Sequence, residues 1–383
     1  MDEKTRLIHA GAGRVPEART VGPAIQRGST VLLPDAKALY DGTLGYGRGG
    51  LNAQFALCEA LCELEGAKAV QVFPSGLAAI TAALTAVLKA GDHLLVVDTV
   101  YKPVRVFCDS VLTRFGVGVD YYDARLDAEG VLALAKPNTR LILLESPGSL
   151  SFEIQDVPGI AAAARERGVL TLMDNTWAAG LLFKPLAAGV DISIQALTKY
   201  VCGHSDVFMG SVAVVDPALA TAMQDAVHHH GWAVTGDDAY QALRGLRTLA
   251  TRLARHGESG LAVARWLQAQ PEVLRVIHPA LPGDDGHDLW SRDFSGACGL
   301  FAFVLRPTSR AAVEAFLDTL KLFGLGFSWG GFESLAINCD PQFQRRTVAV
   351  DYGGPVVRLH IGLESPDDLI ADLRAGLDAS AAV

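Results

Sequence analysis

The chain has 383 residues, of which 50% are hydrophobic and 20% are charged. This apolar content excludes an intrinsically disordered chain, which buries too little surface to offset the entropy of ordering. Lys and Arg number 33 against 42 Asp and Glu, giving a net charge of −9, which argues against a nucleic-acid partner held by a broad basic face. The apolar excess leads us to expect a buried sheet and covered subunit interfaces.

The first 50 residues are rich in Gly and Pro and show little periodicity. They contain no apolar stretch typical of a secretory signal, and no run in the chain approaches the ~20 apolar residues of a membrane span. We therefore expect a cytoplasmic protein with no membrane partner. We predict that residues 1–50 form an arm contacting a neighbouring subunit.

Gly45–Gly50 matches the G-x-G-x-x-G pattern of dinucleotide-binding loops. Such a loop follows a strand and opens a helix, and no strand is predicted before this match. We interpret it as fortuitous. An NAD-dependent oxidoreductase remains a weak alternative, suggested only by this match and the α/β pattern described next.

Short apolar runs alternate with helical patterns between residues 69 and 215. The runs are AVQVF (69–73), HLLVVD (93–98), VDYYD (119–123), RLILLES (140–146), VLTLMD (169–174) and DISIQAL (191–197). They are nearly continuous rather than alternating in hydrophobicity, which is typical of strands buried on both faces of a mostly parallel sheet. The pattern predicts an α/β domain over residues 51–238.

Residues 239–383 have the pattern of a smaller C-terminal α+β domain. Leu and Ala at helical spacing predict one long helix from Ala239 to Gln270, with Arg on its other face. Apolar runs at 299–305 and 356–363 follow, with helices near 310–320 and at the C-terminal end.

Cys and His residues show no metal-binding pattern. Cys58 and Cys62 stand four residues apart in a helical pattern and are expected to pack as small apolar side chains. His228, His229 and His230 are adjacent, so on a helix they point in different directions. We predict that they lie on a surface or interface, and that the protein binds no metal.

Four groups that suit a single cofactor each follow a different predicted strand. Ligands of open α/β sheets bind beyond the carboxyl ends of the strands. Gly76 and Leu77 open a helix there, and its first amides can bind a phosphate. Tyr101, Asp174 and Lys199 follow three other strands and supply a ring, a carboxylate and an amine.

Pyridoxal 5′-phosphate requires all four of these groups: an amine for its aldehyde, an acid for its ring nitrogen, an aromatic ring to stack on and a seat for its phosphate. Taken singly, Asp174 could be a helix cap, Lys199 a surface residue and Tyr101 a turn or core residue. Their joint order favours the cofactor.

The chain resembles the Cys/Met-metabolism pyridoxal-phosphate enzymes. The motifs that carry this resemblance are Ser193–Tyr200 continuing into Gly203–Asp206, Asp174–Trp177 and Tyr46-Gly-Arg48. Further strings resemble one branch of that family, the bacterial cystathionine β-lyases: Glu145–Gly148, Asp237–Tyr240, Leu243–Thr248, His278–Pro282, Phe327–Leu335 and Arg358–Glu364. The resemblance covers nearly the whole chain, and Ser-Trp-Gly-Gly at 328–331 discriminates best.

The resemblance implies an aspartate-aminotransferase-like (type I) fold and a homotetramer built from two active dimers. Lys199 would bind the cofactor as a Schiff base and transfer protons, with Tyr101 as a second catalytic group. The cofactor contacts would come from Asp174, Tyr101, Gly76, Leu77, Thr198 and, across the subunit interface, Tyr46 and Arg48. The substrate contacts would come from Arg358, Ser328, Trp329 and Tyr46.

The implied reaction is α,β-elimination of L-cystathionine to homocysteine, pyruvate and ammonia, as in methionine biosynthesis. Two motifs depart from the wider family: Asn52-Ala-Gln54 stands where many relatives have Asn-Pro-Thr, and Ala196 replaces a Ser. The β-lyases share that alanine. Residues for the distal end of the substrate are not assigned. The alternatives are a cysteine-S-conjugate β-lyase, a γ-lyase acting on cystathionine or methionine, and a non-catalytic regulator that retains the fold.

Overall fold

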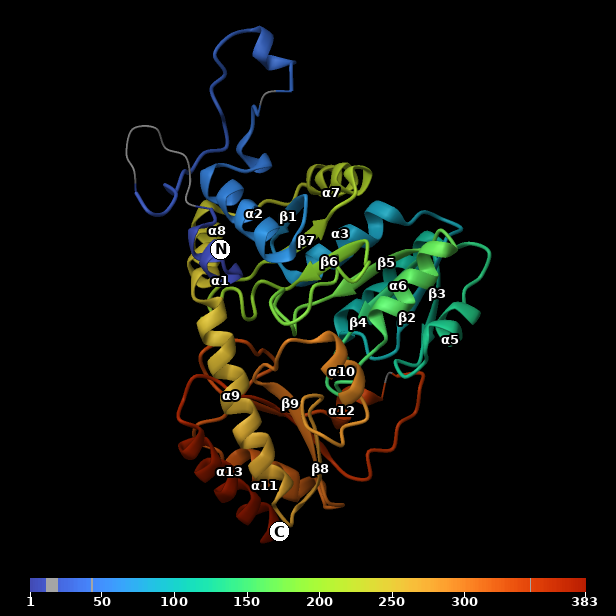
Figure 1. Cartoon of the computed structure of the whole chain (residues 1–383), viewed down its shortest axis with the longest axis vertical. Helices are drawn as coiled ribbons and strands as arrows, with labels where there is room; N and C mark the ends of the chain where they lie inside the picture. The colour runs from blue at the N-terminus through green and yellow to red at the C-terminus, as the bar shows by residue number, and fades with distance from the viewer. Residues whose placement is uncertain (12–19, 43, 345) are drawn as a thin grey trace.

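A computed structural model describes residues 1–11, 20–42, 44–344 and 346–383. Two sheets organise the chain, a seven-stranded sheet formed by residues 69–214 and a five-stranded sheet formed by residues 273–360. Figure 1 shows the larger sheet in the upper half and the smaller one below, with helix α9 (Leu249–Gln268) running down beside the smaller sheet.

The larger sheet has the strand order β1-β7-β6-β5-β4-β2-β3. All neighbouring strands from β6 to β3 are parallel, and β7 is antiparallel to both of its neighbours. The strands are β1 (Ala69–Phe73), β2 (His93–Val97), β3 (Gly118–Tyr122), β4 (Thr139–Glu145), β5 (Leu170–Asp174), β6 (Ile192–Gln195) and β7 (Gly210–Val214). The six predicted runs are thus strands. β7 is an addition, since Gly and Ser in GSVAV weaken its strand pattern.

Helices pack on this sheet through their apolar faces. α2 packs on β1, α3 on β6 and β7, and α6 on β5. The helices are α2 (Asn52–Glu65), α3 (Gly76–Val87), α4 (Lys102–Phe107), α5 (Ala128–Ala133), α6 (Val157–Glu166), α7 (Pro217–His230) and α8 (Gly236–Arg247), with short turns η3 (Cys108–Leu112) and η4 (Thr113–Phe115) after α4. Because helices cover the strands, β2, β6 and β7 are buried along their whole length.

The smaller sheet is mostly antiparallel, in the order β10-β11-β12-β9-β8. Its strands are β8 (Val273–Ile277), β9 (Leu300–Leu305), β10 (Gly324–Leu325), β11 (Leu335–Asn338) and β12 (Val356–His360). Its helices are α10 (His287–Asp293), α11 (Arg310–Thr319), α12 (Asp340–Phe343) and α13 (Pro366–Ala381). Helices α9, α11 and α13 enclose a second core around Phe301, Phe303 and Phe316.

The prediction of one helix over 239–270 is wrong, because α8 and α9 are separate helices that meet at Thr248. The break leaves the carbonyl group of Gly245 available, and the guanidinium of Arg252 binds it at 2.7 Å. The same side chain donates to the Thr248 hydroxyl at 3.0 Å and to the carbonyl of Tyr200 at 2.7 Å. Arg252 therefore stabilises the break and ties it to the segment that carries Lys199.

Residues 20–27 run along α8, where Arg27 pairs with Asp237, and the segment after them extends away from the body of the chain at the top of Figure 1. Large apolar side chains of this segment are exposed: Leu32 is 91% exposed and Tyr40 is 92% exposed. By contrast α1 (Glu3–His9) packs on α2 and α8 of its own chain. The remaining short elements of this region are η1 (Lys37–Leu39) and η2 (Gly47–Gly49). The division into 1–50, 51–238 and 239–383 stays a prediction.

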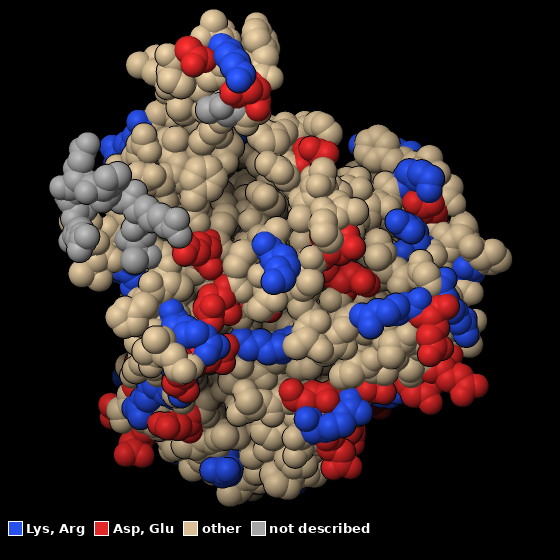
Figure 2. All heavy atoms as spheres, turned by 45° about the horizontal axis from the view of Figure 1, so that its top comes forward, with Lys and Arg blue, Asp and Glu red and all other residues tan. Residues whose placement is uncertain are grey.

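Charges of both signs are interspersed on the face drawn in Figure 2, which carries no broad basic area. Within the described ranges, no helix combines the length and apolar character needed to cross a membrane. His228, His229 and His230 end α7 and are exposed, as the sequence predicts for surface residues.

Candidate active site

Two carboxylates lie side by side at the carboxyl end of the large sheet. Asp174 ends β5 and is paired in register with Glu145, which ends β4. The Asp174 carboxylate accepts hydrogen bonds from the amide of Thr176 at 3.0 Å and from its hydroxyl at 2.5 Å. Burial raises the pKa of Asp174, and the Thr176 bonds and the Lys199 charge oppose that rise. These contacts favour the ionised form of Asp174.

Glu145 is the functional group for which sequence reasoning assigned no role. Its carboxylate accepts a hydrogen bond from the Tyr101 amide at 2.7 Å. Burial, together with the Asp174 charge, holds the pKa of Glu145 well above its usual range. The signal that could have found it was present in the sequence, since Glu145 ends a strand next to the strand that ends in Asp174.

Lys199 follows β6, and its amine donates to the Ser328 hydroxyl at 2.9 Å. Burial and the nearby Arg358 cation lower the pKa of Lys199 to about 8, against the opposing effect of Asp174. The amine also lies 5.5 Å from the centre of the Trp329 ring. A lysine in this setting is neutral over part of the physiological pH range, so it can act as a nucleophile or base.

Arg358 reaches the same place from β12 of the smaller sheet. Its guanidinium donates to the carbonyl of Ser328 at 3.0 Å, while its Nε is buried and has no hydrogen-bond partner among the described residues. Arg358 is only 7% exposed. A buried guanidinium nitrogen left unpaired is costly, which makes it a ready donor for a carboxylate ligand.

Tyr101 begins the segment after β2 that leads into α4, and its ring is 46% exposed. Burial raises the pKa of its phenol, as do the charges of Asp174 and Glu145. The phenol therefore lies close enough to Asp174 and Glu145 for their charges to affect its pKa. The structure therefore gathers Tyr101, Asp174, Lys199, Arg358 and Ser328 from both sheets.

The start of α3 fits a phosphate group. Ser75 caps this helix through the Ala78 amide, and the amides of Gly76 and Leu77 belong to its first turn, whose N–H groups have no acceptor within the helix. A Cβ added to Gly76 would lie 2.5 Å from Cβ of Ala196, so only glycine fits here. Small side chains thus keep the helix terminus open to an anion.

Thr198 lies on the same segment as Lys199. Its hydroxyl donates to the carbonyl of Met209 at 3.1 Å and accepts from the amide of that residue at 2.9 Å. This double contact fixes the turn after β6, and a hydroxyl oxygen has further capacity to accept or redirect a bond. Its assignment to the phosphate stays a prediction.

Tyr46 and Arg48 stay apart from this group within one chain. They lie at η2, whose Gly47–Gly49 turn packs on α7, and the Arg48 guanidinium lies 5.3 Å from the centre of the Tyr46 ring. Among the residues described, no hydrogen bond or ion pair joins either of them to Lys199. Their contact with the cofactor of a neighbouring subunit stays a prediction.

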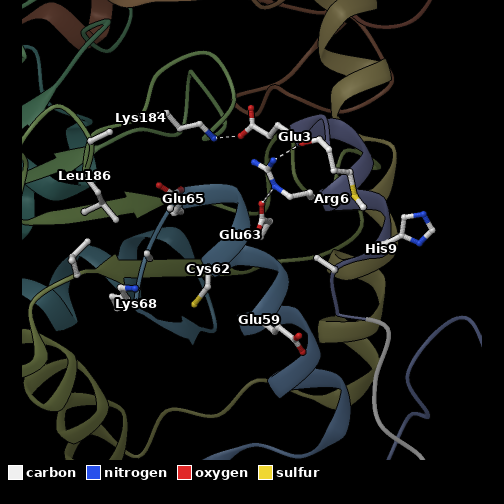
Figure 3. A pocket seen from close by; sticks show the side chains of 16 residues that line it. Glu3, Arg6, His9, Glu59, Cys62, Glu63, Glu65, Lys68, Lys184 and Leu186 are labelled. Carbon is white, nitrogen blue, oxygen red and sulfur yellow. Dashed lines mark hydrogen bonds and ion pairs between the residues drawn. The ribbon is translucent and has the colours of Figure 1, made fainter.

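A separate surface hollow of about 880 Å³ lies between α1, α2 and the segment around Lys184 (Figure 3). Two ion pairs lie in it, Arg6 with Glu63 and Lys184 with Glu3. None of the predicted site residues lines it. In the described part of the chain, no cluster of His, Cys, Asp or Glu could hold a metal ion.

An amine of lowered pKa near a buried strand-end carboxylate, on the segment that packs against the start of α3, suits a cofactor that carries both a carbonyl and a phosphate. These are the features of the pyridoxal-phosphate class of enzymes with the type I fold. The family model of the Cys/Met metabolism PLP-dependent enzymes matches residues 4–378, and the chain belongs to this family. Its cofactor is therefore pyridoxal phosphate, and the weak NAD-dependent alternative is dropped.

Individual relatives agree with the family match. The chain is 47% identical to a putative cystathionine β-lyase of Rhizobium johnstonii, over 99% of this chain and 96% of that protein. It is 43% identical to the cystathionine β-lyase of Escherichia coli, over 97% of each. The crystal structure of cystathionine γ-lyase from Lactobacillus plantarum with L-serine superposes with a TM-score of 0.92 at 28% identity, covering all of both chains. The fold prediction is confirmed.

Proposed function

We propose that this enzyme cleaves L-cystathionine by α,β-elimination, releasing homocysteine, pyruvate and ammonia. Relatives named cystathionine β-lyase match nearly the whole chain at up to 47% identity. The observation that carries the proposal is the unpaired, buried Nε of Arg358 next to the Lys199 amine, because it pairs a carboxylate receptor with a base. An α-amino acid is the substrate class that presents a carboxylate and an acidic Cα–H together.

Arg358 binds the α-carboxylate of the substrate in this proposal. A guanidinium presents two parallel N–H donors to a carboxylate, which an ammonium group does not. Ser328 and Trp329 lie beside it, and the Ser328 carbonyl already accepts from Arg358 at 3.0 Å. These contacts fix the direction of the substrate Cα–H bond relative to Lys199.

Lys199 transfers the proton. Its pKa of about 8 allows the neutral amine to take the proton from Cα and the resulting ammonium to return it to the departing sulfur. The Cβ–S bond breaks as the Cα electron pair forms the Cα–Cβ double bond. Homocysteine leaves as the thiol, and the remaining three-carbon enamine hydrolyses in water to pyruvate and ammonia. Tyr101, at the mouth of the site, is the second candidate to protonate the sulfur.

Asp174, Tyr101, the amides of Gly76 and Leu77, and Thr198 hold the cofactor in this proposal. When bound, the cofactor supplies an electron sink for the carbanion at Cα. Asp174 would pair with the protonated ring nitrogen, and its hydrogen bonds from Thr176 favour the carboxylate form that this pairing needs. Glu145 holds the Tyr101 backbone in place at 2.7 Å.

We further propose that the enzyme is a homotetramer of active dimers in the cytoplasm. The exposed apolar side chains Leu32 and Tyr40 support the proposal that this segment is an arm that packs on a second chain. Tyr46 and Arg48 would then reach the phosphate of the neighbouring site.

The identity of the product tests the reaction. β-Elimination of L-cystathionine yields pyruvate, whereas γ-elimination yields 2-oxobutyrate, so both 2-oxo acids should be quantified in the same reaction mixture. Pyruvate in proportion to homocysteine is expected. Predominant 2-oxobutyrate would establish the γ-lyase alternative, and S-alkylcysteine cleaved far faster than cystathionine would favour the S-conjugate lyase.

A further inference from the structure

We infer that His360 is a positioning residue that holds the turn Ser328–Gly331 against Lys199, and so places the two side chains beside the substrate. The inference rests on the proposed function only where substrate kinetics are used. No role follows for His360 from the reaction itself, since it touches neither Lys199 nor the guanidinium of Arg358 through any hydrogen bond of the described residues.

His360 contacts the turn directly. It lies two residues after Arg358 on β12, so both side chains leave the same face of the strand. Its Nε2 is 3.1 Å from the amide nitrogen of Gly330 and 3.1 Å from the carbonyl oxygen of Gly331. The side chain is 0% exposed. In the neutral ring, Nε2 either accepts from the Gly330 N–H or donates to the Gly331 carbonyl, so either tautomer ties His360 to the turn.

Gly330 brings that turn against the backbone of Lys199. Its φ is +80°, a left-handed conformation that glycine adopts without strain. A Cβ added there would lie 2.8 Å from the amide nitrogen of Tyr200 and 2.9 Å from Cα of Lys199. The turn is thus seated directly on the residue that transfers the proton, and a small displacement changes the distance between Ser328 and Lys199.

The other two anchors of the turn are engaged in the proposed reaction. Ser328 accepts from the Lys199 amine at 2.9 Å and from Arg358 at 3.0 Å. Both donors are needed elsewhere once cofactor and substrate are bound. Among the hydrogen bonds of the described residues, the contact with His360 is the one that holds the turn without taking part in the reaction. It positions Ser328 together with the packing of the Trp329 ring on Tyr200, whose ring centres are 5.6 Å apart.

The chemistry of His360 also argues against a simple packing role. Its Nδ1 is buried without a hydrogen-bond partner in the described ranges, a cost that a leucine of similar size would avoid. Burial and the cationic or basic neighbours His256, Arg358 and Lys199 lower the pKa of His360 to about 3. The ring is therefore neutral, and Nε2 can accept the Gly330 N–H bond at any physiological pH.

Hydrogen exchange of the holoenzyme, followed by mass spectrometry, tests the inference without using substrate. In His360→Leu the peptide covering residues 326–333 should exchange about fivefold faster than in the wild type, since one hydrogen bond contributes about 1 kcal/mol. His278→Leu is the matched control. His278 is also 0% exposed in the smaller domain, with a pKa lowered to about 4 and an unpaired Nε2. It should leave exchange of this peptide unchanged.

Kinetics then connect the turn to the reaction. His360→Leu should raise KM for L-cystathionine about fivefold while the visible absorbance of the bound cofactor is kept, and His360→Gln, which retains an acceptor, should recover part of both effects. Wild-type protection of the turn in His360→Leu, or equal loosening in His278→Leu, would overturn the inference. If His360→Leu does not fold, faster exchange of the turn in His360→Gln than in the wild type supports the inference, and full protection with raised KM refutes it. If the wild type does not cleave cystathionine, the proposed function fails while the exchange comparison still decides the role of His360.

Discussion

Replacing Arg358 with lysine separates the charge of this residue from its geometry. The substitution keeps a cation beside Lys199 and removes the planar fork of donors. In the structure, one arm of that fork donates to the Ser328 carbonyl at 3.0 Å and Nε is buried and unpaired. A lysine ammonium has no arrangement that satisfies the Ser328 carbonyl and binds a carboxylate bidentately.

The expected loss follows from one missing charge-assisted hydrogen bond. Such a bond contributes about 1.5–3 kcal/mol. At about 1.4 kcal/mol per factor of ten, Arg358→Lys should lower kcat/KM for L-cystathionine roughly 10- to 150-fold. Most of this should appear in KM, because the carboxylate contact is made in the ground state as well as the transition state.

Pyruvate release from L-cystathionine, followed over a range of substrate concentrations, measures this effect. Arg374→Lys is the control, since Arg374 pairs with Glu272 at 2.5 Å on α13, outside the site. It should leave kcat/KM unchanged. An Arg358→Lys enzyme with kcat/KM within threefold of the wild type, and a normal cofactor spectrum, would refute the assignment of Arg358 to the substrate carboxylate.

Three further predictions follow from the same geometry. Lys199→Ala should lose the visible absorbance of the bound cofactor together with pyruvate release, and turnover at the wild-type rate would contradict its assigned role. In the apoenzyme, acetylation of Lys199 measured by peptide mass spectrometry should rise with a midpoint near pH 8, because burial and Arg358 lower its pKa to about 8 and the neutral amine is the reactive form. Arg358→Leu should move this midpoint to higher pH, and an unchanged midpoint would exclude the effect of Arg358 on Lys199. Asp98→Ala should lower the free energy of unfolding by about 3–5 kcal/mol in a urea titration, because it leaves the buried Arg105 cation, 2.6 Å from Asp98 in the wild type, unpaired. The control Asp123→Ala removes the more exposed pair with Arg125 and should lower the free energy of unfolding by less than about 1 kcal/mol.

Much of the large domain could be predicted from the sequence, because its signals are local. Continuous apolar runs mark strands buried on both faces, and the residue after each strand lies at one edge of a parallel sheet whatever the strand order. That rule alone predicts the meeting of Tyr101, Asp174 and Lys199. It holds because strand direction, a property of each βα unit, decides which ends of the strands share an edge.

Other features depend on contacts that leave no local pattern. The helix break at Thr248 is compensated by the Arg252 guanidinium, which binds carbonyl groups of Gly245 and Tyr200. Periodicity continues through the break, so the sequence predicts one helix there. β7 likewise enters the sheet between β1 and β6 in the antiparallel direction, an order that strand patterns do not encode.

The sequence by itself determined the class of chemistry: an amine, a carboxylate, a ring and a phosphate seat, each after its own strand. Tertiary structure decided how these groups are tuned. Burial lowers the pKa of Lys199, the register of β4 and β5 places Glu145 beside Asp174, and Gly330 packs its turn closely against the backbone of Lys199. Such effects arise from distance and desolvation between segments remote in the chain, and therefore only the packed fold produces them.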